Sequence, residues 1–291
     1  MRYEGAIFRP PSEAESLILQ VTIGCSHNKC KFCGSYKEKR FKVRSLEEIK
    51  EDLKETKGYA RLIRRVFIAD GDALVVPQRM LLPIFAEIRN TFPRLERIGI
   101  YGNVKSILKK SVDDLRSLKE LKLGIIYLGV ESGDQVTLDR MNKGTTIDKI
   151  EEAARRVKEA GILLSVTVLL GVGGEERSRI HAEETGKLLS RIEPDYVGAL
   201  TLIIIPGTPL AEEQREGKFK LPDRYKLLEE LYTMVENINV KRTFFASNHA
   251  SNYLALKGWL PEEKEKMLQA IRYVLSTKDP SFLRPEYLRA L

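Results

Sequence analysis

The three cysteines of the chain lie in one short window, at positions 25, 30 and 33, with four residues and then two residues between them. An odd number of thiols grouped so closely is a poor disulfide framework. Thiolates bind iron–sulfur clusters and zinc. Cys25, Cys30 and Cys33 could hold three irons of a 4Fe–4S cluster and leave the fourth iron open to a non-protein ligand. Alternatively, His27 could complete a tetrahedral zinc site, and redox-active thiols are a third interpretation.

Strand and helix patterns alternate around and after this window. Near-continuous apolar segments predict six strands, at residues 17–23, 66–69, 98–101, 125–130, 163–170 and 197–205. Helical patterns fall between them, at residues 45–57, 80–90, about 111–120 and 150–160. This order predicts a parallel α/β sheet covered by helices, either open or curled into a partial barrel. In both architectures ligands bind at the carboxyl ends of the strands.

The pattern changes after residue 210. A helix is predicted at 223–237, a strand at 241–247, a polar stretch at 248–253 and a helix from 261 onward. We therefore expect a core of residues 1–210 and an extension of residues 211–291 packed on it.

Polar residues follow several of the predicted strands. Asp70-Gly71-Asp72 follows the second strand, Asn103 the third, and Glu131-Ser132-Gly133 the fourth. Taken singly these are weak signals, because polar residues after strands commonly cap the next helix. Glycine-rich segments follow the fifth and sixth strands, at 170–175 and 205–209.

Together these motifs resemble the radical S-adenosylmethionine (SAM) superfamily. That family carries a three-cysteine loop after the first strand, with an aromatic residue, here Phe32, just before the third cysteine. The similarity covers about residues 15–210. The first cysteine gap departs from the family pattern, because four residues stand where three are usual.

The resemblance implies a partial (β/α)6 parallel TIM-like barrel with a C-terminal α/β extension. It implies that Cys25, Cys30 and Cys33 hold a 4Fe–4S cluster, that the acidic turn receives the amino group of SAM, and that Glu131 reaches the ribose. The full set of implied cofactor-binding residues is Phe32, Asp70, Gly71, Asp72, Asn103, Glu131 and Ser132. It also implies an electron donor of the flavodoxin or ferredoxin type, reductive cleavage of SAM to a 5′-deoxyadenosyl radical, and hydrogen abstraction from a substrate.

The substrate residues are less defined. The polar stretch that contains Asn248, His249 and Asn252 follows an apolar strand and could line a substrate pocket. The same pattern fits an Asx-turn before a helix. Tyr36 is a further catalytic candidate.

Composition limits the class of protein. With 43% hydrophobic and 31% charged residues, a folded core is expected. No apolar run approaches the ~18 residues that span a bilayer, and the charged N-terminus predicts a cytoplasmic protein. The 49 basic and 41 acidic residues give a net charge of +8, which suits a tRNA or an anionic small molecule without deciding between them.

A zinc- or cluster-binding, RNA-interacting protein without radical chemistry remains the alternative, and the oligomeric state is open. Because all cysteines lie in one window, sulfur insertion of the methylthiotransferase type is not expected.

Overall fold

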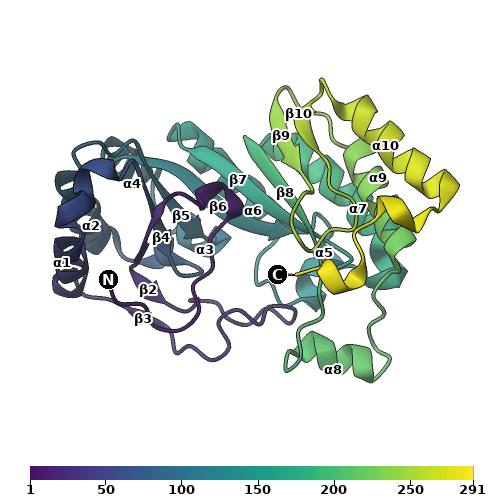
Figure 1. Cartoon of the computed structure of the whole chain (residues 1–291), viewed down its shortest axis with the longest axis horizontal. Coiled ribbons are helices and arrows are strands. Elements are labelled where there is room, and N and C mark those ends of the chain that lie inside the picture. Colours follow the sequence, from purple (N-terminus) through teal and green to yellow (C-terminus); the bar gives the residue numbers. More distant parts are fainter. Residues whose placement is uncertain (291) are drawn as a thin grey trace. The chain divides into compact units, whose positions relative to one another are not determined.

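The computed structural model describes residues 1–290 and divides into two compact units (Figure 1). Unit 1 contains residues 1–28, 35–128 and 152–164, and unit 2 contains residues 29–34, 129–151 and the chain from 165 onward. In the part of the chain described, no helix is both long enough and apolar enough to cross a membrane.

Unit 1 is built on parallel strands. Its strands are β1 (Leu17–Gln20), β2 (Thr22–Ile23), β3 (Lys42–Val43), β4 (Arg65–Ala69), β5 (Arg97–Gly102) and β6 (Leu123–Glu131), the last three residues of which belong to unit 2. Strands β1, β4, β5 and β6 are parallel neighbours in this order. Buried apolar residues fill these strands, as expected for a sheet that is covered on both faces.

Three of the four helices of unit 1 follow the predicted pattern, and α3 was not predicted. They are α1 (Leu46–Glu55), α2 (Gln78–Thr91), α3 (Val104–Leu108) and α4 (Val112–Glu120), with 3₁₀ turns at Pro11–Glu13, Lys57–Leu62 and Ala73–Val75. Ser45 caps α1 and Ser111 caps α4, each through a reciprocal capping box. Helices α1 and α2 lie side by side (Figure 1).

The first predicted strand is divided in the structure, so the prediction of one continuous strand at 17–23 is wrong. β1 ends at Gln20 and pairs with β4, whereas β2 turns away and pairs antiparallel with β3. The backbone N–H of Val21, between the two pieces, donates to Ala69 O at 2.8 Å. The chain leaves the parallel sheet at this point to enter the cysteine window.

Unit 2 holds the remaining strands of the sheet. They are β7 (Leu163–Leu170), which begins in unit 1, β8 (Tyr196–Thr201), β9 (Thr243–Ala246) and β10 (Lys257–Leu260). Strands β7, β8 and β9 are parallel neighbours, and β10 pairs antiparallel with β9. The ladder of β8 stops at Thr201, four residues earlier than the sequence predicts.

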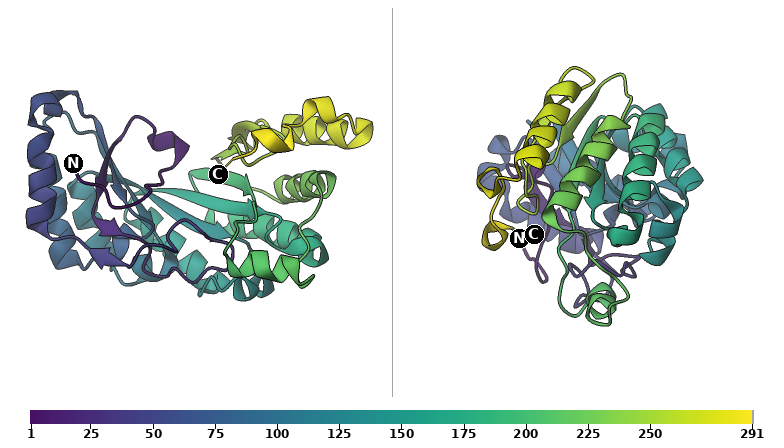
Figure 2. Two further views of the ribbon diagram at one scale, coloured as in Figure 1. Left: turned by 60° about the horizontal axis from the view of Figure 1, so that its bottom comes forward. Right: turned by 90° about the vertical axis from the view of Figure 1, so that its right-hand side faces the viewer.

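The helices of unit 2 are α5 (Gln135–Arg140), α6 (Ile147–Glu159), whose second half lies in unit 1, α7 (Gly174–Ile192), α8 (Pro209–Arg215), α9 (Arg224–Glu236) and α10 (Lys264–Thr277), with 3₁₀ turns at Pro280–Phe282 and Glu286–Leu288. Helix α9 contacts both α7 and α10, and α9 and α10 lie side by side in both views of Figure 2. The sequence patterns did not predict α5, α7 or α8.

Strands are therefore present at all six predicted places, the first of them divided into β1 and β2, and the α/β class with a mostly parallel sheet is confirmed. The boundary at residue 210 stays a prediction. The structure shows that β9, from the segment after that boundary, extends the sheet in register beside β8.

Candidate functional site

The acidic turn after β4 is built around Asp70, which is fully buried. Its Oδ2 accepts hydrogen bonds from Gln20 Nε2 and from the backbone N–H of Gly24, both at 2.9 Å, and pairs with Lys39 Nζ at 2.8 Å. The other oxygen, Oδ1, is buried and has no hydrogen-bond partner among residues 1–290. Asp70 therefore holds the chain just before Cys25 and keeps one acceptor atom unused.

Asp72, two residues later, has both oxygens occupied. Oδ1 accepts from the Asn103 backbone N–H at 3.0 Å and from Ser106 Oγ at 2.6 Å. Oδ2 accepts from Asn103 Nδ2 at 2.7 Å and from the hydroxyl of Ser26. Burial raises the pKa of Asp72 to about 6, although these hydrogen bonds act in the opposite direction.

Asn103 also caps α3, since its side chain accepts from the Ser106 backbone N–H at 2.8 Å. Together Asp72 and Asn103 connect the ends of β4 and β5 to Ser26, the residue after Cys25. This arrangement gives Asp72 and Asn103 a structural role in the cysteine loop that the sequence did not reveal.

Gly71, between the two aspartates, lies against the ring of Tyr36. A Cβ built on Gly71 would lie 2.5 Å from the Tyr36 ring. Tyr36 is buried, and its ring also makes an edge contact with Phe8 and lies under Lys39 Nζ. These contacts place Tyr36 as a packing residue of unit 1, and its catalytic role stays a prediction without support from these contacts.

The second half of the cysteine window, residues 29–34, belongs to unit 2. Its backbone is held by two other segments: Lys31 N donates to Met141 O at 3.0 Å, and Leu210 N donates to Lys31 O at 3.1 Å. Lys31 Nζ pairs with Glu213 at 2.6 Å. Helix α8 thus supports the loop, and Thr208, in the predicted glycine-rich segment at 205–209, caps this helix with Pro209 as its first residue.

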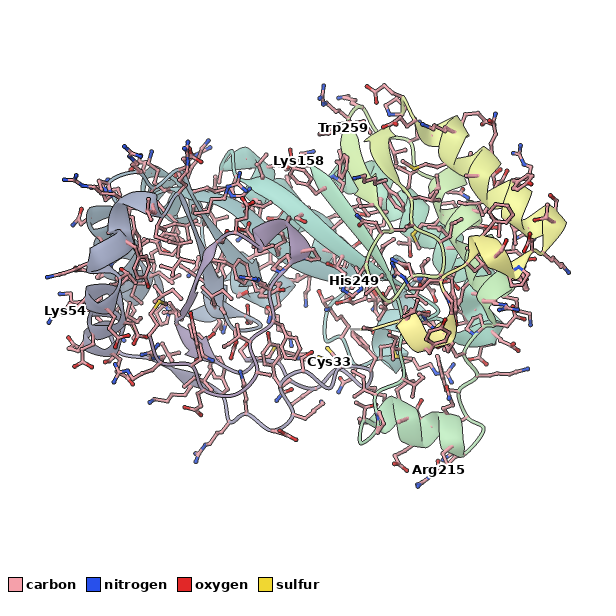
Figure 3. The ribbon with its side chains drawn as sticks, viewed as in Figure 1. Cys33, Lys54, Lys158, Arg215, His249 and Trp259 are labelled. Atoms are coloured by element: carbon pink, nitrogen blue, oxygen red, sulfur yellow. The ribbon has the colours of Figure 1, made fainter. Side chains whose placement is uncertain are left out.

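Phe32 packs, half-buried, against an apolar cluster in unit 2. The buried members of this cluster are Met141, Leu169, Val172, Leu202, Leu210 and Phe219. The ring therefore anchors the loop beside Cys33, which is labelled in Figure 3.

The turn after β6 carries Glu131, whose backbone is in the left-handed region with φ of 66°. A residue other than glycine adopts this region at a cost, and such residues concentrate at functional sites. Glu131 Oε1 accepts from Lys143 Nζ at 2.7 Å, and both side chains are largely buried. No sequence pattern pointed to Lys143, which lies after α5.

Ser132 faces away from solvent. Its hydroxyl lies 2.7 Å from His181 Nδ1 and accepts from the Asp134 backbone N–H at 3.0 Å. The side chain is fully buried. The structure therefore gives Ser132 partners inside the protein and brings in His181, which lies on the unpredicted helix α7.

The polar stretch after β9 attaches to the end of β8. The Thr201 hydroxyl donates to Asn252 Oδ1 at 2.7 Å, and Asn252 Nδ2 donates to Ala199 O at 2.8 Å. Asn252 is buried, whereas Asn248 is exposed. These contacts make Asn252 a structural bridge at the carboxyl end of β8.

His249 is half-buried and is labelled in Figure 3. Its Nδ1 accepts from the Ser251 backbone N–H at 3.1 Å and lies 2.9 Å from the Ser251 hydroxyl. Burial, and then the charge of Arg284, lowers the pKa of His249 below its usual range. The ring is accordingly neutral at pH 7, with its proton on Nε2.

The donor chemistry of the window fits an iron–sulfur cluster. None of the three cysteines is in a disulfide, all three are partly exposed, and thiolates are soft ligands of the kind that iron–sulfur clusters use. Cys25 lies in unit 1, and Cys30 and Cys33 lie in unit 2. Within residues 1–290, no three His, Cys, Asp or Glu side chains already form a metal-binding group.

The decisive comparison is with protein families. The family model of the radical SAM superfamily matches residues 19–185, which is more than half of the chain and includes all three cysteines and the turns after β4, β5 and β6. The chain belongs to the radical SAM superfamily. Enzymes of this superfamily bind a 4Fe–4S cluster and SAM and require a reductant, so the predictions of family, enzyme and cofactors are confirmed.

Curated relatives have low sequence identity. An uncharacterized protein, MJ0486 of Methanocaldococcus jannaschii, is 25% identical over 250 residues, which cover 82% of this chain and 74% of the relative. Ribosomal protein uS12 methylthiotransferase RimO of Caldanaerobacter subterraneus subsp. tengcongensis is 25% identical, over 72% of this chain and 49% of its own length. A tRNA-2-methylthio-N(6)-dimethylallyladenosine synthase of Dehalococcoides mccartyi is 26% identical, over 77% and 54%. The chain thus spans about half the length of these two named enzymes.

Solved structures confirm the fold. Methylornithine synthase (PylB) has a TM-score of 0.52 with 23% identity and covers 77% of this chain and 63% of its own. Coproporphyrinogen III oxidase (HemN) from Escherichia coli has a TM-score of 0.57 with 16% identity, over 76% of this radical SAM chain and 51% of its own. The partial TIM-like barrel predicted from the sequence is the fold of these radical SAM enzymes.

Proposed function

We propose that Cys25, Cys30 and Cys33 hold a 4Fe–4S cluster in this enzyme and that it abstracts hydrogen from a substrate that is not yet identified. When bound, the cluster and SAM supply the radical chemistry by reductive cleavage of SAM to a 5′-deoxyadenosyl radical. The observation that carries the proposal is the bracing of the backbone on both sides of Cys25: Asp70 holds Gly24 and Asp72 holds Ser26.

The predicted SAM-binding residues divide into two groups. Asp70 has the unused buried oxygen, which suits the ammonium group of the methionine part, and Glu131 presents a carboxylate beside Lys143, which suits the ribose hydroxyls. Gly71 gives the backbone room beside Tyr36.

The other predicted residues support the cysteine loop and the Glu131 turn instead of contacting SAM. Asp72, Asn103 and Ser132 have their side chains satisfied within the protein, so we assign them to positioning the cysteine loop and the Glu131 turn. Phe32 anchors the second half of the loop in the apolar cluster.

The reductant, substrate and compartment follow as proposals. The three cysteines form no disulfide, which suits a reducing compartment, so we propose a cytoplasmic enzyme reduced by a flavodoxin- or ferredoxin-like donor. The net charge of +8 suits either a small anionic substrate or a tRNA. A tRNA predicts binding that weakens steeply with salt, and a small molecule does not.

The test is anaerobic reconstitution with iron and sulfide. The wild type should take up about four irons and four sulfides per chain. Replacing Cys25, Cys30 or Cys33 individually with Ala should abolish this uptake, and the matched variant His27→Ala should retain it. Bound zinc without iron, lost in His27→Ala, would instead support the zinc-binding alternative.

A further inference from the structure

A buried polar chain in unit 2 connects the turn after β6 with the turn after β7. It consists of Ser132, His181 on α7 and Glu230 on α9. All three side chains are buried, although Ser, His and Glu are residue types that usually keep contact with solvent. Burying such polar groups is costly unless they find partners inside the protein, so their contacts with one another are informative.

The hydrogen bonds indicate which atoms of Ser132 and His181 carry the protons. Ser132 Oγ accepts from the Asp134 backbone N–H and lies 2.7 Å from His181 Nδ1, and with the hydroxyl as the donor of this pair its proton points to Nδ1. The proton of the ring then lies on Nε2, which faces Glu230 Oε1 at 3.4 Å. The geometry of this last contact is not that of a hydrogen bond, so it acts as an electrostatic contact.

Glu230 connects Ser132 and His181 to the turn after β7. Its Oε1 accepts from the backbone N–H of Gly171 at 2.5 Å, and its Oε2 accepts from the Ser178 hydroxyl. Gly171 directly follows β7 and has φ of +84°, a conformation that an L side chain rarely adopts. A single carboxylate from α9 therefore fixes both the Gly171 turn and, through His181, the Ser132 turn.

The Glu131 turn has a second attachment to α7. The Gly133 backbone N–H donates to Thr185 Oγ1 at 2.8 Å, and a Cβ on Gly133 would collide with the backbone of Glu184. The turn that carries Glu131 thus packs against α7, and α7 packs against α9. A shift of the turn would therefore have to break the Gly133–Thr185 hydrogen bond and disturb this close packing.

The residue types Ser, His and Glu also occur in hydrolase triads, but that chemistry does not fit here. The Ser132 hydroxyl is fully buried, so no substrate carbonyl reaches it. The same hydroxyl is held by the Asp134 backbone. The arrangement holds a turn in place and exposes no nucleophile.

We propose that His181 and Glu230 are positioning residues for SAM, and that Glu230 makes the segment after residue 210 a required part of the SAM site. This inference rests on the proposed function, because it takes Glu131 as a SAM contact. When the contacts among Ser132, His181 and Glu230 are lost, the Glu131 and Gly171 turns can move. The affinity for SAM then falls, although neither His181 nor Glu230 touches SAM.

The test compares SAM binding to reconstituted protein by anaerobic isothermal titration calorimetry. His181→Leu and Glu230→Gln should raise the Kd for SAM about tenfold, equivalent to about 1.4 kcal/mol. His181→Asn, which can keep a polar contact to Ser132, should recover part of the affinity. The control is Ser190→Ala, which removes a different hydroxyl of α7, bonded at 2.8 Å to the Asn239 backbone N–H beyond α9. It should lower the melting temperature but leave the Kd within about twofold.

A second readout does not depend on the cluster. The chain has three histidines, so the ¹⁵N spectrum of their imidazoles is simple to assign. His181 should show the tautomer with the proton on Nε2 in the wild type, and Glu230→Gln should shift its Nε2 resonance. A His181 ring with its proton on Nδ1 would contradict the proposed contacts from Ser132 through His181 to Glu230.

The outcomes separate this inference from the proposed function. If Glu131→Gln weakens SAM binding but His181→Leu and Glu230→Gln do not, these contacts are purely structural and the inference is wrong. If Glu131→Gln leaves SAM binding unchanged, the assignment of Glu131 under the proposed function is wrong as well. If His181→Leu does not fold, Glu230→Gln and His181→Asn decide the question.

Discussion

The carboxylate of Asp70 accepts a hydrogen bond from the backbone N–H of Gly24 at 2.9 Å, one residue before Cys25. The same oxygen receives the ammonium group of Lys39, beyond the far end of the cysteine window, at 2.8 Å. One buried oxygen thus holds the residues on both sides of the cysteine window, Gly24 before it and Lys39 after it. The geometry of the thiol loop depends on this turn after β4 as well as on the cysteines themselves.

We predict that Asp70→Asn destabilises the protein. The Asp70–Lys39 pair is buried, with 0% and 8% of the side chains exposed, and removing one partner leaves the other charge uncompensated. The expected loss in the free energy of unfolding is about 3 kcal/mol, measured by urea denaturation of the cluster-free protein. The control is Glu212→Gln, in an exposed pair with Arg215, which should change stability by less than about 0.5 kcal/mol. Equal effects of the two variants would contradict the role given to Asp70.

A second prediction concerns pH. Burial raises the pKa of Asp72 from 3.8 to about 6, so the folded state binds a proton that the unfolded state releases between these values. The free energy of unfolding should therefore fall as pH rises from about 4 to about 6. The contribution is fully present below about pH 4, is lost above about pH 6, and amounts to about 3 kcal/mol.

The measurement is urea unfolding of the wild type and Asp72→Asn over this pH range. Asn does not titrate, so the difference between the two proteins isolates Asp72. A difference that is constant with pH, or one that grows in favour of the wild type as pH rises, would contradict the assignment.

We further predict that Gly71→Ala is destabilising by about 2 kcal/mol, because its methyl group would lie 2.5 Å from the Tyr36 ring. The thermal unfolding midpoint reports the change. Tyr36→Leu in the same chain should restore part of the loss by making room. The matched substitution Gly58→Ala meets no atom within 4 Å and should have little effect. If the double variant is no more stable than Gly71→Ala, steric contact with Tyr36 is not the cause.

The bridge at the end of β8 gives a fourth prediction. Asn252→Asp would place a carboxylate oxygen against the carbonyl of Ala199, which now receives the amide of Asn252 at 2.8 Å. Loss of this buried donor should cost about 2 kcal/mol in the free energy of unfolding, measured by urea denaturation. Asn248→Asp, on the exposed neighbour, should be nearly neutral. Similar losses in both variants would show that the effect is added charge and not the lost bridge.

The sequence predicted well what depends on local pattern. Apolar runs located the strands, and Ser45 and Ser111 were recognisable caps for their helices. Because parallel strands end at one edge, Asp70, Asp72, Asn103 and Glu131 could be placed at strand ends before any coordinates. Strand ends were less exact: β8 stops at Thr201, where Ser251 and Asn252 replace the ladder with side-chain bonds.

The partners of the site residues could not be predicted, because they come from segments that fold together from a distance. Lys39 and Lys143 are ordinary surface-type residues in the sequence, and only packing brings them to Asp70 and Glu131. Helix α7 was missed because its buried face includes His181 and Thr185 among its apolar residues. Its pattern therefore lacks a clean apolar stripe, and the same polar residues are the ones that support the Glu131 turn.

The most direct test of the account is the production of 5′-deoxyadenosine. Reconstituted protein is mixed anaerobically with dithionite and SAM, and the nucleoside is quantified by liquid chromatography, with Cys30→Ala as the matched control. We expect 5′-deoxyadenosine from the wild type and none from Cys30→Ala. A fully loaded cluster that binds SAM yet yields no 5′-deoxyadenosine, or equal yields from the two proteins, would contradict it.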